Sequence, residues 1–195
     1  EKRLLPVDEI AMMGRHNYAN ALAALAACEL IGLPTPPSLD VLRTFRGLPH
    51  RMQFVRELGG VRYVNDSKAT NVGATIASVL AVDGPVILLA GGQGKGGDFE
   101  ALADATKNCL HTVVAYGEDA DALDSAFTGK VPVVRTRTLV QALTEARDTA
   151  SEVIATTGSR GATVLLAPAC ASFDQFDNYL LRGEAFCDIV SGWKA

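Results

Sequence analysis

A short polar segment near the middle of the chain, residues 66–71 (DSKATN), carries groups that could bind or polarise a ligand. It offers a carboxylate, an ammonium group, two hydroxyls and an amide within six positions. An apolar run at 61–65 precedes it and an Ala-rich run at 72–82 follows it, which predicts a strand, a loop and a helix. Loops after strands bind ligands in open α/β folds. The same residue types are ordinary in turns and helix caps, so a structural role stays open.

The glycine-rich segment 91–98, after the next predicted strand, supports two interpretations. Residues 92–97 match the GxGxxG spacing of dinucleotide-binding folds, which keeps an NAD-binding oxidoreductase among the alternatives. Asp98 stands at the start of the following helix, where its carboxylate would repel a pyrophosphate. The better interpretation is a loop that presents the ammonium group of Lys95 to an anion.

A third polar segment, 168–174, follows the last predicted strand. Ser172 lacks the GxSxG context of a nucleophilic serine. Cys170 has no cation or histidine beside it in sequence, and we expect a buried small residue rather than a reactive thiol. The amides at the start of a helix predicted from Gln175, together with the Ser172 hydroxyl, would suit a carboxylate ligand.

Strand and helix patterns alternate through most of the chain and predict an α/β fold, a doubly wound, mainly parallel, Rossmann-like sheet of about six strands. The predicted strands are 52–58, 61–65, 85–90, 112–116, 131–134 and 163–167. The predicted helices are 72–82, 99–106, 120–127, 139–156 and 175–191. Because loops that follow parallel strands emerge at one edge, we expect the polar segments 66–71, 91–98, 117–119 and 168–174 to converge.

The first part of the chain has a different pattern, with helices predicted at 18–31 and 39–45, the second capped by Ser38. A turn-rich joint at 47–51 then marks a predicted domain boundary. The residues before this joint would be a helical remnant of a preceding domain. The chain also opens without an initiator methionine, and we expect it to be a fragment of a longer protein.

Composition limits the partners and the setting of this 195-residue chain. The net charge is −4 and no basic stripe is present, which argues against nucleic acid or an anionic membrane as a partner. Four cysteines and three histidines are dispersed, so neither a zinc site nor a disulfide framework is expected, and the thiols should be reduced as in the cytoplasm. The sequence has no apolar run of membrane-spanning length and no visible signal peptide.

Five segments together resemble the Mur ligase family of peptidoglycan synthesis, and in particular its D-glutamate-adding branch. They are 14–24 (GRHNYANALAA), 47–51 (GLPHR), 65–71 (NDSKATN), 89–92 (LAGG) with Lys95, and 168–176 (PACASFDQF). They follow the family's order over nearly the whole chain. DSKATN with PACASxDQF distinguishes this branch from its relatives.

The resemblance implies an ATP-dependent carboxylate–amine ligase that adds D-glutamate to UDP-N-acetylmuramoyl-L-alanine through an acyl phosphate. This step belongs to peptidoglycan precursor synthesis, and hence to cell-wall biogenesis, cell shape and cell division. Residues 1–47 would be the end of the central ATPase domain and residues 48–195 the C-terminal domain. The family's P-loop, its modified lysine that helps to hold Mg²⁺ and its uridine-nucleotide domain have no counterpart here. We expect a cytoplasmic monomer that uses ATP and Mg²⁺, with no metal ligand in this chain and no activity of the chain alone.

The resemblance also implies a site for the two carboxylates of D-glutamate. Thr70 and Lys95 would bind one carboxylate, and Ser172 with the backbone near Tyr179 would bind the other. Tyr179 departs from the phenylalanine usual in the family, which is harmless if only its N–H is used. Two separated contacts would also select the D over the L enantiomer.

On the nucleotide side, the resemblance assigns His16, Asn17 and Asn20 to the adenine of ATP. It assigns Arg51 and Asp66 to ATP when the domains close. The spacing of the two asparagines places them on one helix face, where they could read a nucleobase edge or simply cap the helix.

Arg51 and Lys68 are the predicted catalytic residues. An arginine near transferring phosphates stabilises developing charge, and Lys68 could do the same for the acyl phosphate. For Lys68, an ion pair with Asp66 is an alternative of equal weight. No nucleophile is expected, so catalysis would rest on positioning and electrostatics, completed by closure about the 47–51 joint.

Three alternatives stay open. Another ATP-dependent amino-acid ligase of the superfamily, similar to folylpolyglutamate synthase, would add L-glutamate. A nucleotide-dependent oxidoreductase would have to use the glycines of 92–97. A binding or scaffold module would lose no ligand affinity when Thr70 or Lys95 is replaced by alanine.

Overall fold

Six strands form one sheet in the computed structural model, which describes residues 3–12 and 16–194. They are β1 (Gln53–Leu58), β2 (Val61–Asn65), β3 (Val86–Gly91), β4 (Leu110–Tyr116), β5 (Val133–Arg135) and β6 (Ala162–Leu166). Their order across the sheet is β1-β2-β6-β3-β4-β5. β1 and β2 form an antiparallel hairpin, and the other neighbouring pairs are parallel. The predicted mainly parallel sheet is confirmed.

Helices cover both faces of this sheet. α3 (Val72–Leu80), α4 (Phe99–Thr106) and α5 (Ala120–Phe127) pack on one face, and α6 (Leu139–Thr157) and α7 (Tyr179–Gly192) pack on the other. All six residues of β3 are buried, which is why this strand reads as an unbroken apolar run. Leu88 joins the core under α3, α4 and α5, whereas Leu89 joins the core under α6 and α7. Each such side chain contributes roughly 1.5–3 kcal/mol when fully buried, so β3 anchors both layers.

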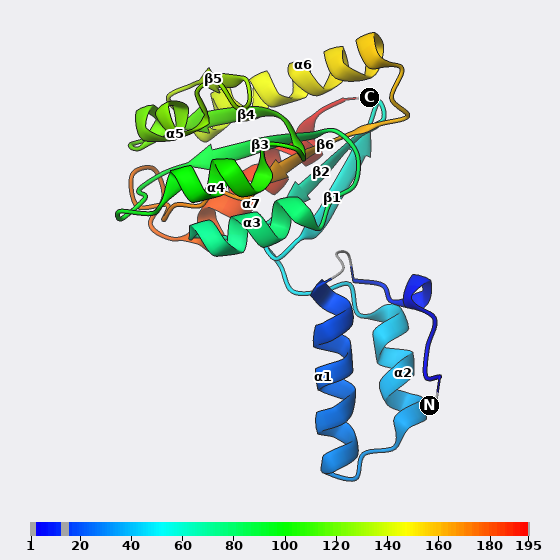
Figure 1. The fold of residues 1–195 in the computed structure, drawn as a ribbon. Helices are drawn as coiled ribbons and strands as arrows, with labels where there is room; N and C mark the ends of the chain where they lie inside the picture. Colours follow the sequence, from blue (N-terminus) through cyan, green and yellow to red (C-terminus); the bar gives the residue numbers. More distant parts are fainter. Residues whose placement is uncertain (1–2, 13–15, 195) are drawn as a thin grey trace.

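The N-terminal part contains a short 3-10 helix, η1 (Val7–Glu9), and two helices, α1 (His16–Leu30) and α2 (Thr35–Thr44). Figure 1 shows α1 and α2 side by side, apart from the sheet and joined to it by a narrow connection. Within residues 3–12 and 16–194, no helix has both the length and the apolar character needed to cross a membrane.

The start of α2 differs from the prediction. The helix begins at Thr35 rather than at residue 39, because prolines occupy its first positions, where a helix needs no N–H donor. The predicted N-cap role of Ser38 is therefore wrong. Its hydroxyl lies within the helix and donates to the Pro34 carbonyl at 3.2 Å.

The connection between the two parts has a constrained backbone. Gly47, His50 and Met52 have φ angles of 94°, 60° and 44°. This left-handed region suits glycine, but it strains residues that carry a Cβ. Hydrogen bonds hold the strained conformation, among them one from the His50 N–H to Gln53 Oε1 at 2.9 Å. The joint therefore has a defined shape.

The start of α7 also corrects the prediction. The helix begins at Tyr179 rather than at Gln175, because the Asn178 side chain caps it by accepting the N–H of Leu181 at 3.0 Å. Gln175 lies in a turn, where its N–H donates to the Ser172 carbonyl at 3.0 Å. The free amides of this helix start therefore lie near Tyr179.

Glycine at the end of β3 allows main chains to approach closely. Gly92 has a φ of 118°, and its N–H donates to the Tyr116 carbonyl at 3.1 Å. A Cβ at this position would lie 2.2 Å from the carbonyl oxygen of Ala171. Both the backbone angle and the available space therefore require glycine here.

We predict that Gly92→Ala lowers the free energy of unfolding by about 3 kcal/mol or more, because the new methyl group forces two loops apart. Gly129→Ala is the matched control, since Gly129 also has a positive φ (73°) but has open space around its Cβ position. The control should cost only about 1 kcal/mol. Urea unfolding followed by circular dichroism measures both, and equal losses would contradict the close-approach argument.

Candidate functional site

The loops after four parallel strands converge at one edge of the sheet, as predicted. Gly91 N–H donates to the Pro168 carbonyl at 2.9 Å, which joins the end of β3 to the loop after β6. Gln93 and Ala171 exchange two hydrogen bonds, each of 2.9 Å. Ala169 N–H donates to Ala69 at 3.0 Å and so reaches the 66–71 loop. Main-chain hydrogen bonds therefore connect segments that are far apart in sequence.

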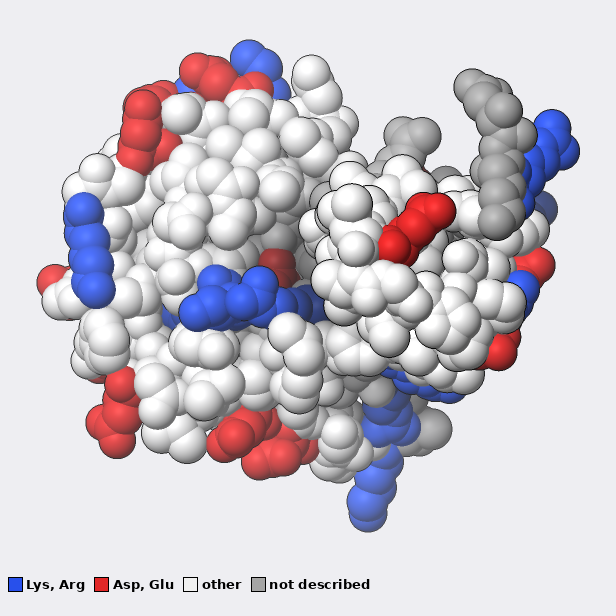
Figure 2. Space-filling view, turned by 90° about the horizontal axis from the view of Figure 1, so that it is seen from below, with Lys and Arg blue, Asp and Glu red and all other residues white. Residues whose placement is uncertain are grey.

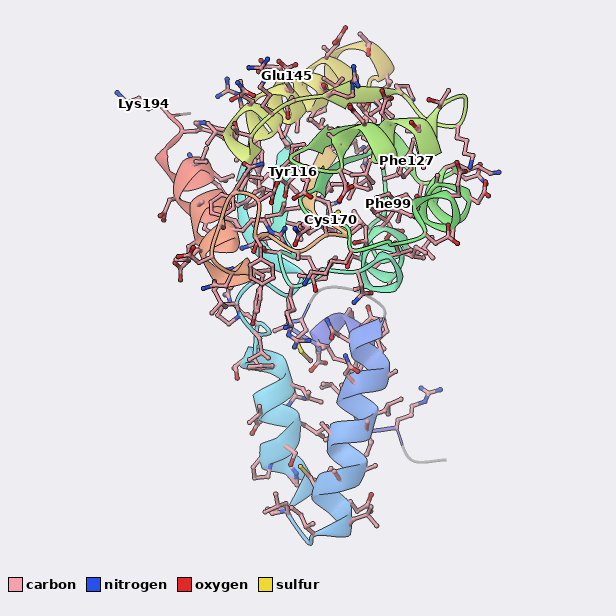
Figure 3. All side chains as sticks on the ribbon, turned by 90° about the vertical axis from the view of Figure 1, so that its left-hand side faces the viewer. Phe99, Tyr116, Phe127, Glu145, Cys170 and Lys194 are labelled. Carbon is pink, nitrogen blue, oxygen red and sulfur yellow. The ribbon has the colours of Figure 1, made fainter. Side chains whose placement is uncertain are left out.

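The sheet topology makes this edge a natural ligand site. β3 and β6 are neighbours, but β3 leads to α4 on one face and β6 leads to α7 on the other. Neighbouring strands whose connections leave in opposite directions create a crevice at their carboxyl ends. In Figure 3, Cys170 lies on the side of the sheet nearer the N-terminal helices, whereas Glu145 lies on the far side.

Arg182, on the first turn of α7, joins the 66–71 loop to the 168–174 loop. The guanidinium is completely buried, and it donates from Nε to Ser67 Oγ and from Nη2 to the Ser67 carbonyl, both at 2.9 Å. Its Nη1 donates to the Cys170 carbonyl at 3.1 Å. Sequence patterns did not indicate this role, because an arginine in a helix normally reaches solvent.

Two further buried groups lie in this region. Cys170 is completely buried, which confirms the expected buried small residue, and burial raises the pKa of its thiol to about 12, which disfavours the nucleophilic thiolate. Burial also raises the pKa of Tyr116 to about 12. The Tyr116 hydroxyl has no hydrogen-bond partner among the described residues.

A cavity of about 540 Å³ lies between the start of α1, the joint, the 66–71 loop and α3. Five predicted residues line it, namely Asn17, Asn20, Arg51, Asp66 and Lys68. Figure 2 shows Lys and Arg side chains gathered at the hollow where the two parts meet. The structure therefore brings together the predicted nucleotide-side residues whose side chains it describes. His16 is the first residue of α1, and its side chain lies outside the described residues.

Three of the cavity residues have defined surroundings. Asn20 Nδ2 donates to Asn17 Oδ1 at 3.0 Å, one turn away on α1. Asp66 is only 7% exposed, and its carboxylate accepts a hydrogen bond from the Ser78 hydroxyl on α3. These contacts orient the amide and carboxylate groups without filling the cavity.

Lys68 resolves one of the predicted alternatives. No ion pair joins it to Asp66, although both side chains lie within the described part of the chain. Its Nζ instead lies 4.2 Å from the centroid of the Tyr179 ring. The ion-pair alternative is therefore wrong for this structure, and the ammonium charge is not neutralised by that carboxylate.

The four residues predicted to bind D-glutamate are not among those that line this cavity; three lie on the converged loops, and Tyr179 begins α7. Thr70 N–H donates to the Lys68 carbonyl at 2.8 Å. Lys95 is exposed, with its Nζ 4.9 Å from the centroid of the Phe173 ring. Ser172 is 3% exposed, and no described residue hydrogen-bonds to its hydroxyl. Tyr179 is the first residue of α7, where helix N–H groups lack intrahelical acceptors.

The glycine-rich loop at 91–98 makes close contacts with the protein's own side chains. Gly94 N–H donates to the Asp119 carboxylate at 2.6 Å. A Cβ at Gly94 would lie 2.5 Å from the ring of Phe99. The GxGxxG spacing is therefore explained by loop packing, and the Gly94 N–H, a donor of the kind that binds a pyrophosphate, is already bound to the Asp119 carboxylate.

His50, which sequence patterns did not single out as a site residue, is fixed beside Arg51. The imidazole is 6% exposed, and Asn65 Nδ2 lies 2.9 Å from its Nδ1. A Cβ at Gly183 would lie 2.2 Å from the same nitrogen, so α7 packs directly on the ring. Burial lowers the pKa of His50, and the negative charge of Glu184 opposes this shift.

We predict that Arg182→Met lowers the free energy of unfolding by about 3 kcal/mol or more, because it leaves two buried carbonyls without their donors. Arg135→Met is the control, since Arg135 is 55% exposed and forms surface ion pairs with Asp121 and Asp124. The control should change stability by less than about 1 kcal/mol. Urea denaturation of both variants measures the two losses of stability. Similar losses would contradict the claim that Arg182 holds the two loops together.

We also predict a pH dependence of stability from His50. Its folded-state pKa lies below the unfolded value of 6.5, so the unfolded chain binds the proton more tightly. The stability contribution is complete above pH 6.5 and decreases as the pH falls below it, towards the lower pKa of the folded state. His50→Asn should flatten this dependence between pH 7.5 and 5.5, whereas replacement of the exposed His111 by Asn should preserve it. An unchanged slope in His50→Asn would refute the assignment.

Comparison with known proteins assigns the chain to a family. The model of the Mur ligase glutamate ligase domain matches residues 50–170, which is more than half of the chain. A UDP-N-acetylmuramoylalanine–D-glutamate ligase from Methylococcus capsulatus is 48% identical over 187 residues, covering 96% of this chain and 39% of the relative. One from Legionella pneumophila is 46% identical over 195 residues, covering 98% of this chain and 42% of the relative. The chain thus spans about two fifths of the length of these relatives.

Solved structures show the same fold at low sequence identity. A Mycobacterium tuberculosis folylpolyglutamate synthase complexed with ADP and AMPPCP matches with a TM-score of 0.69 and 18% identity, over 90% of this chain and 41% of that one. A pseudomurein peptide ligase type C from Methanothermus fervidus matches with a TM-score of 0.61 and 16% identity, over 91% of this chain and 36% of that one. Because the family match covers all six strands of the sheet, the chain belongs to the Mur ligase family and contains its glutamate ligase domain.

Proposed function

We propose that this chain is the C-terminal part of an ATP-dependent ligase that joins D-glutamate to UDP-N-acetylmuramoyl-L-alanine in peptidoglycan precursor synthesis. The names of the relatives and their similarity to almost the whole chain support this proposal. The observation that carries it is the cavity lined by Arg51, Asp66 and Lys68 beside the edge where the polar loops converge. The reaction would proceed through an acyl phosphate that the amine of D-glutamate attacks.

The division into domains is part of the proposal. Residues 1–47 would complete a central ATPase domain, and residues 48–195 would form the C-terminal domain. The separation of α1 and α2 from the sheet and the start of the family match at residue 50 support this boundary. We also propose a cytoplasmic monomer, because the substrates are small metabolites and no proposed contact needs a second copy.

On the nucleotide side, the amides of Asn17 and Asn20 would read the adenine edge. Arg51 and Lys68 would stabilise charge on the transferring phosphoryl group and on the acyl phosphate. Asp66, fixed by Ser78, would orient the nucleotide as the two parts close on each other. Catalysis would depend on position and charge rather than on a covalent intermediate with the protein.

The magnesium ion that accompanies ATP would be held mainly by the rest of the protein. Among the described residues, no group of three or more His, Cys, Asp or Glu side chains could hold a metal ion. Among the residues that the structure describes, Asp66 is the one carboxylate that lines the cavity and could act as an anionic oxygen donor. The proposed roles of Arg51 and Lys68 require no metal contact.

On the amino-acid side, D-glutamate needs two separated anion-binding groups. Thr70 and Lys95 would bind one carboxylate, and the Ser172 hydroxyl with the Tyr179 N–H would bind the other. Hydrogen bonds to charged groups contribute about 1.5–3 kcal/mol each. The L enantiomer would leave one of these partners unpaired, which supports selection of the D form.

One alternative has an observation in its favour. The folylpolyglutamate synthase structure shares the fold, so a ligase specific for L-glutamate would place its loops at the same sheet edge. An oxidoreductase has less support, because Asp119 and Phe99 occupy the surroundings of Gly94. The preferred enantiomer of glutamate separates the two ligases.

Calorimetric titration of the chain with D-glutamate and with L-glutamate tests the proposal. We expect weak binding of the D form, near 1 mM or about −4 kcal/mol, since the substrate-side domains are absent. Lys95→Met should abolish it. Replacement of Lys107, an exposed lysine paired with Asp104, by Met should leave it unchanged.

The other outcomes are informative. Preference for L-glutamate would support the folylpolyglutamate synthase-like alternative. If neither enantiomer binds the chain, the titration is repeated on the longer protein with ATP present. Failure there as well would contradict the proposed function.

A further inference from the structure

The ammonium group of Lys68 lies on an aromatic ring at the edge of the cavity. Its Nζ is 4.2 Å from the centroid of Tyr179, within the range of a cation–π interaction. Lys68 also lines the cavity that Arg51 and Asp66 share. Both Lys68 and Tyr179 are half-buried, so solvent screens this contact less than it screens a fully exposed one.

The Tyr179 ring is itself held in place. Its main-chain carbonyl accepts the Ser67 hydroxyl at 2.8 Å, and the residue begins α7 directly after the Asn178 cap. The ring meets the imidazole of His50 edge-on, with centroids 6.4 Å apart and an interplanar angle of 82°. The His50 carbonyl in turn accepts the Lys68 N–H at 3.1 Å. His50, Tyr179 and Lys68 thus form a closed set of contacts.

Contact with an aromatic face and contact with a carboxylate have different effects on the charge of a lysine ammonium group. A carboxylate such as Asp66 would neutralise the ammonium charge and occupy its N–H donors. A ring face attracts the cation through its quadrupole and carries no net charge, so the positive charge remains available. The structure shows the second arrangement.

We propose that Tyr179 is a positioning residue for Lys68, and that its ring holds the ammonium group at the cavity rim with its charge available to a phosphate or acyl phosphate. The proposal rests on the ligase function proposed above and adds a role for the Tyr179 side chain. The contact also connects Lys68 with the joint, because His50 touches both residues and precedes Arg51. Phenylalanine would serve equally as the ring, whereas an aliphatic side chain would not.

The contact itself is tested by NMR on the chain with labelled lysines. The ring current should shift the ε-methylene protons of Lys68 upfield, and Lys68→Met identifies this signal by removing it. Tyr179→Leu should abolish the shift, and Tyr179→Phe should keep it. Phe173→Leu is the matched control, because it removes the ring beside Lys95 and should leave the Lys68 signal in place. A Lys68 signal that does not respond to Tyr179→Leu would overturn the proposal.

The functional role is tested in the longer protein by ADP release that depends on D-glutamate. Tyr179→Leu keeps the main-chain N–H, so we expect kcat to fall about three- to fivefold with little change in KM for D-glutamate. In a Lys68→Met background the same substitution should have no further effect on kcat. Equal losses in both backgrounds would overturn the positioning role.

Failure of the underlying function has a different signature. A wild-type protein that releases no ADP in response to D-glutamate, while the Lys68 signal keeps its upfield shift, would contradict the ligase function and with it the role of the contact. Activity without coupling between positions 68 and 179 would contradict only the positioning role.

Discussion

A buried guanidinium holds together the edge of the sheet where the polar loops converge. Arg182 is shielded completely from solvent, and its hydrogen bonds reach both the 66–71 loop and the 168–174 loop. Transfer of a cation from water into a protein interior costs several kcal/mol, and here hydrogen bonds to three oxygens offset that cost. None of these oxygens belongs to a carboxylate. Among the described residues Arg182 forms no ion pair, so its positive charge contributes to a field that favours anions at the neighbouring edge.

The rest of this edge depends largely on main-chain contacts. The paired hydrogen bonds between Gln93 and Ala171 continue the order of the sheet beyond its strands. Ala169 adopts a φ of 60°, a strained value for alanine that the surrounding contacts maintain. Main-chain contacts of this kind need small residues nearby. A glycine spacing typical of dinucleotide binding can therefore arise from loop packing alone.

Much of the fold was predictable because local patterns and tertiary packing agree. The apolar run of β3 and the alternation of strands with helices predicted a sheet covered on both faces, and the parallel topology predicted the converging loops.

The role of Arg182 was not predictable, because its partner Ser67 lies 115 positions away. Lys68 and Asp66 are near neighbours in sequence, which kept an ion pair open as an alternative, but the ammonium group instead lies on the ring of Tyr179, which is distant in sequence. The start of α7 was misplaced because Gln175 and Asn178 both suit a helix entry, and a turn at Ser172 decides between them. Site roles came from family resemblance rather than from spacing.

The strained joint has a consequence for the entropy of assembly. A flexible linker lets two bodies sample many orientations, and bringing them together then loses that freedom. Here His50 and Met52 both hold left-handed backbone angles, and packing against α7 restricts the first of them further. The joint therefore has few accessible backbone conformations, and it connects the helix that carries Asn17 and Asn20 to the sheet. Arg51 lies between the two strained residues and lines the cavity, so closure of the two parts about this joint would lose less orientational entropy than closure about a flexible linker.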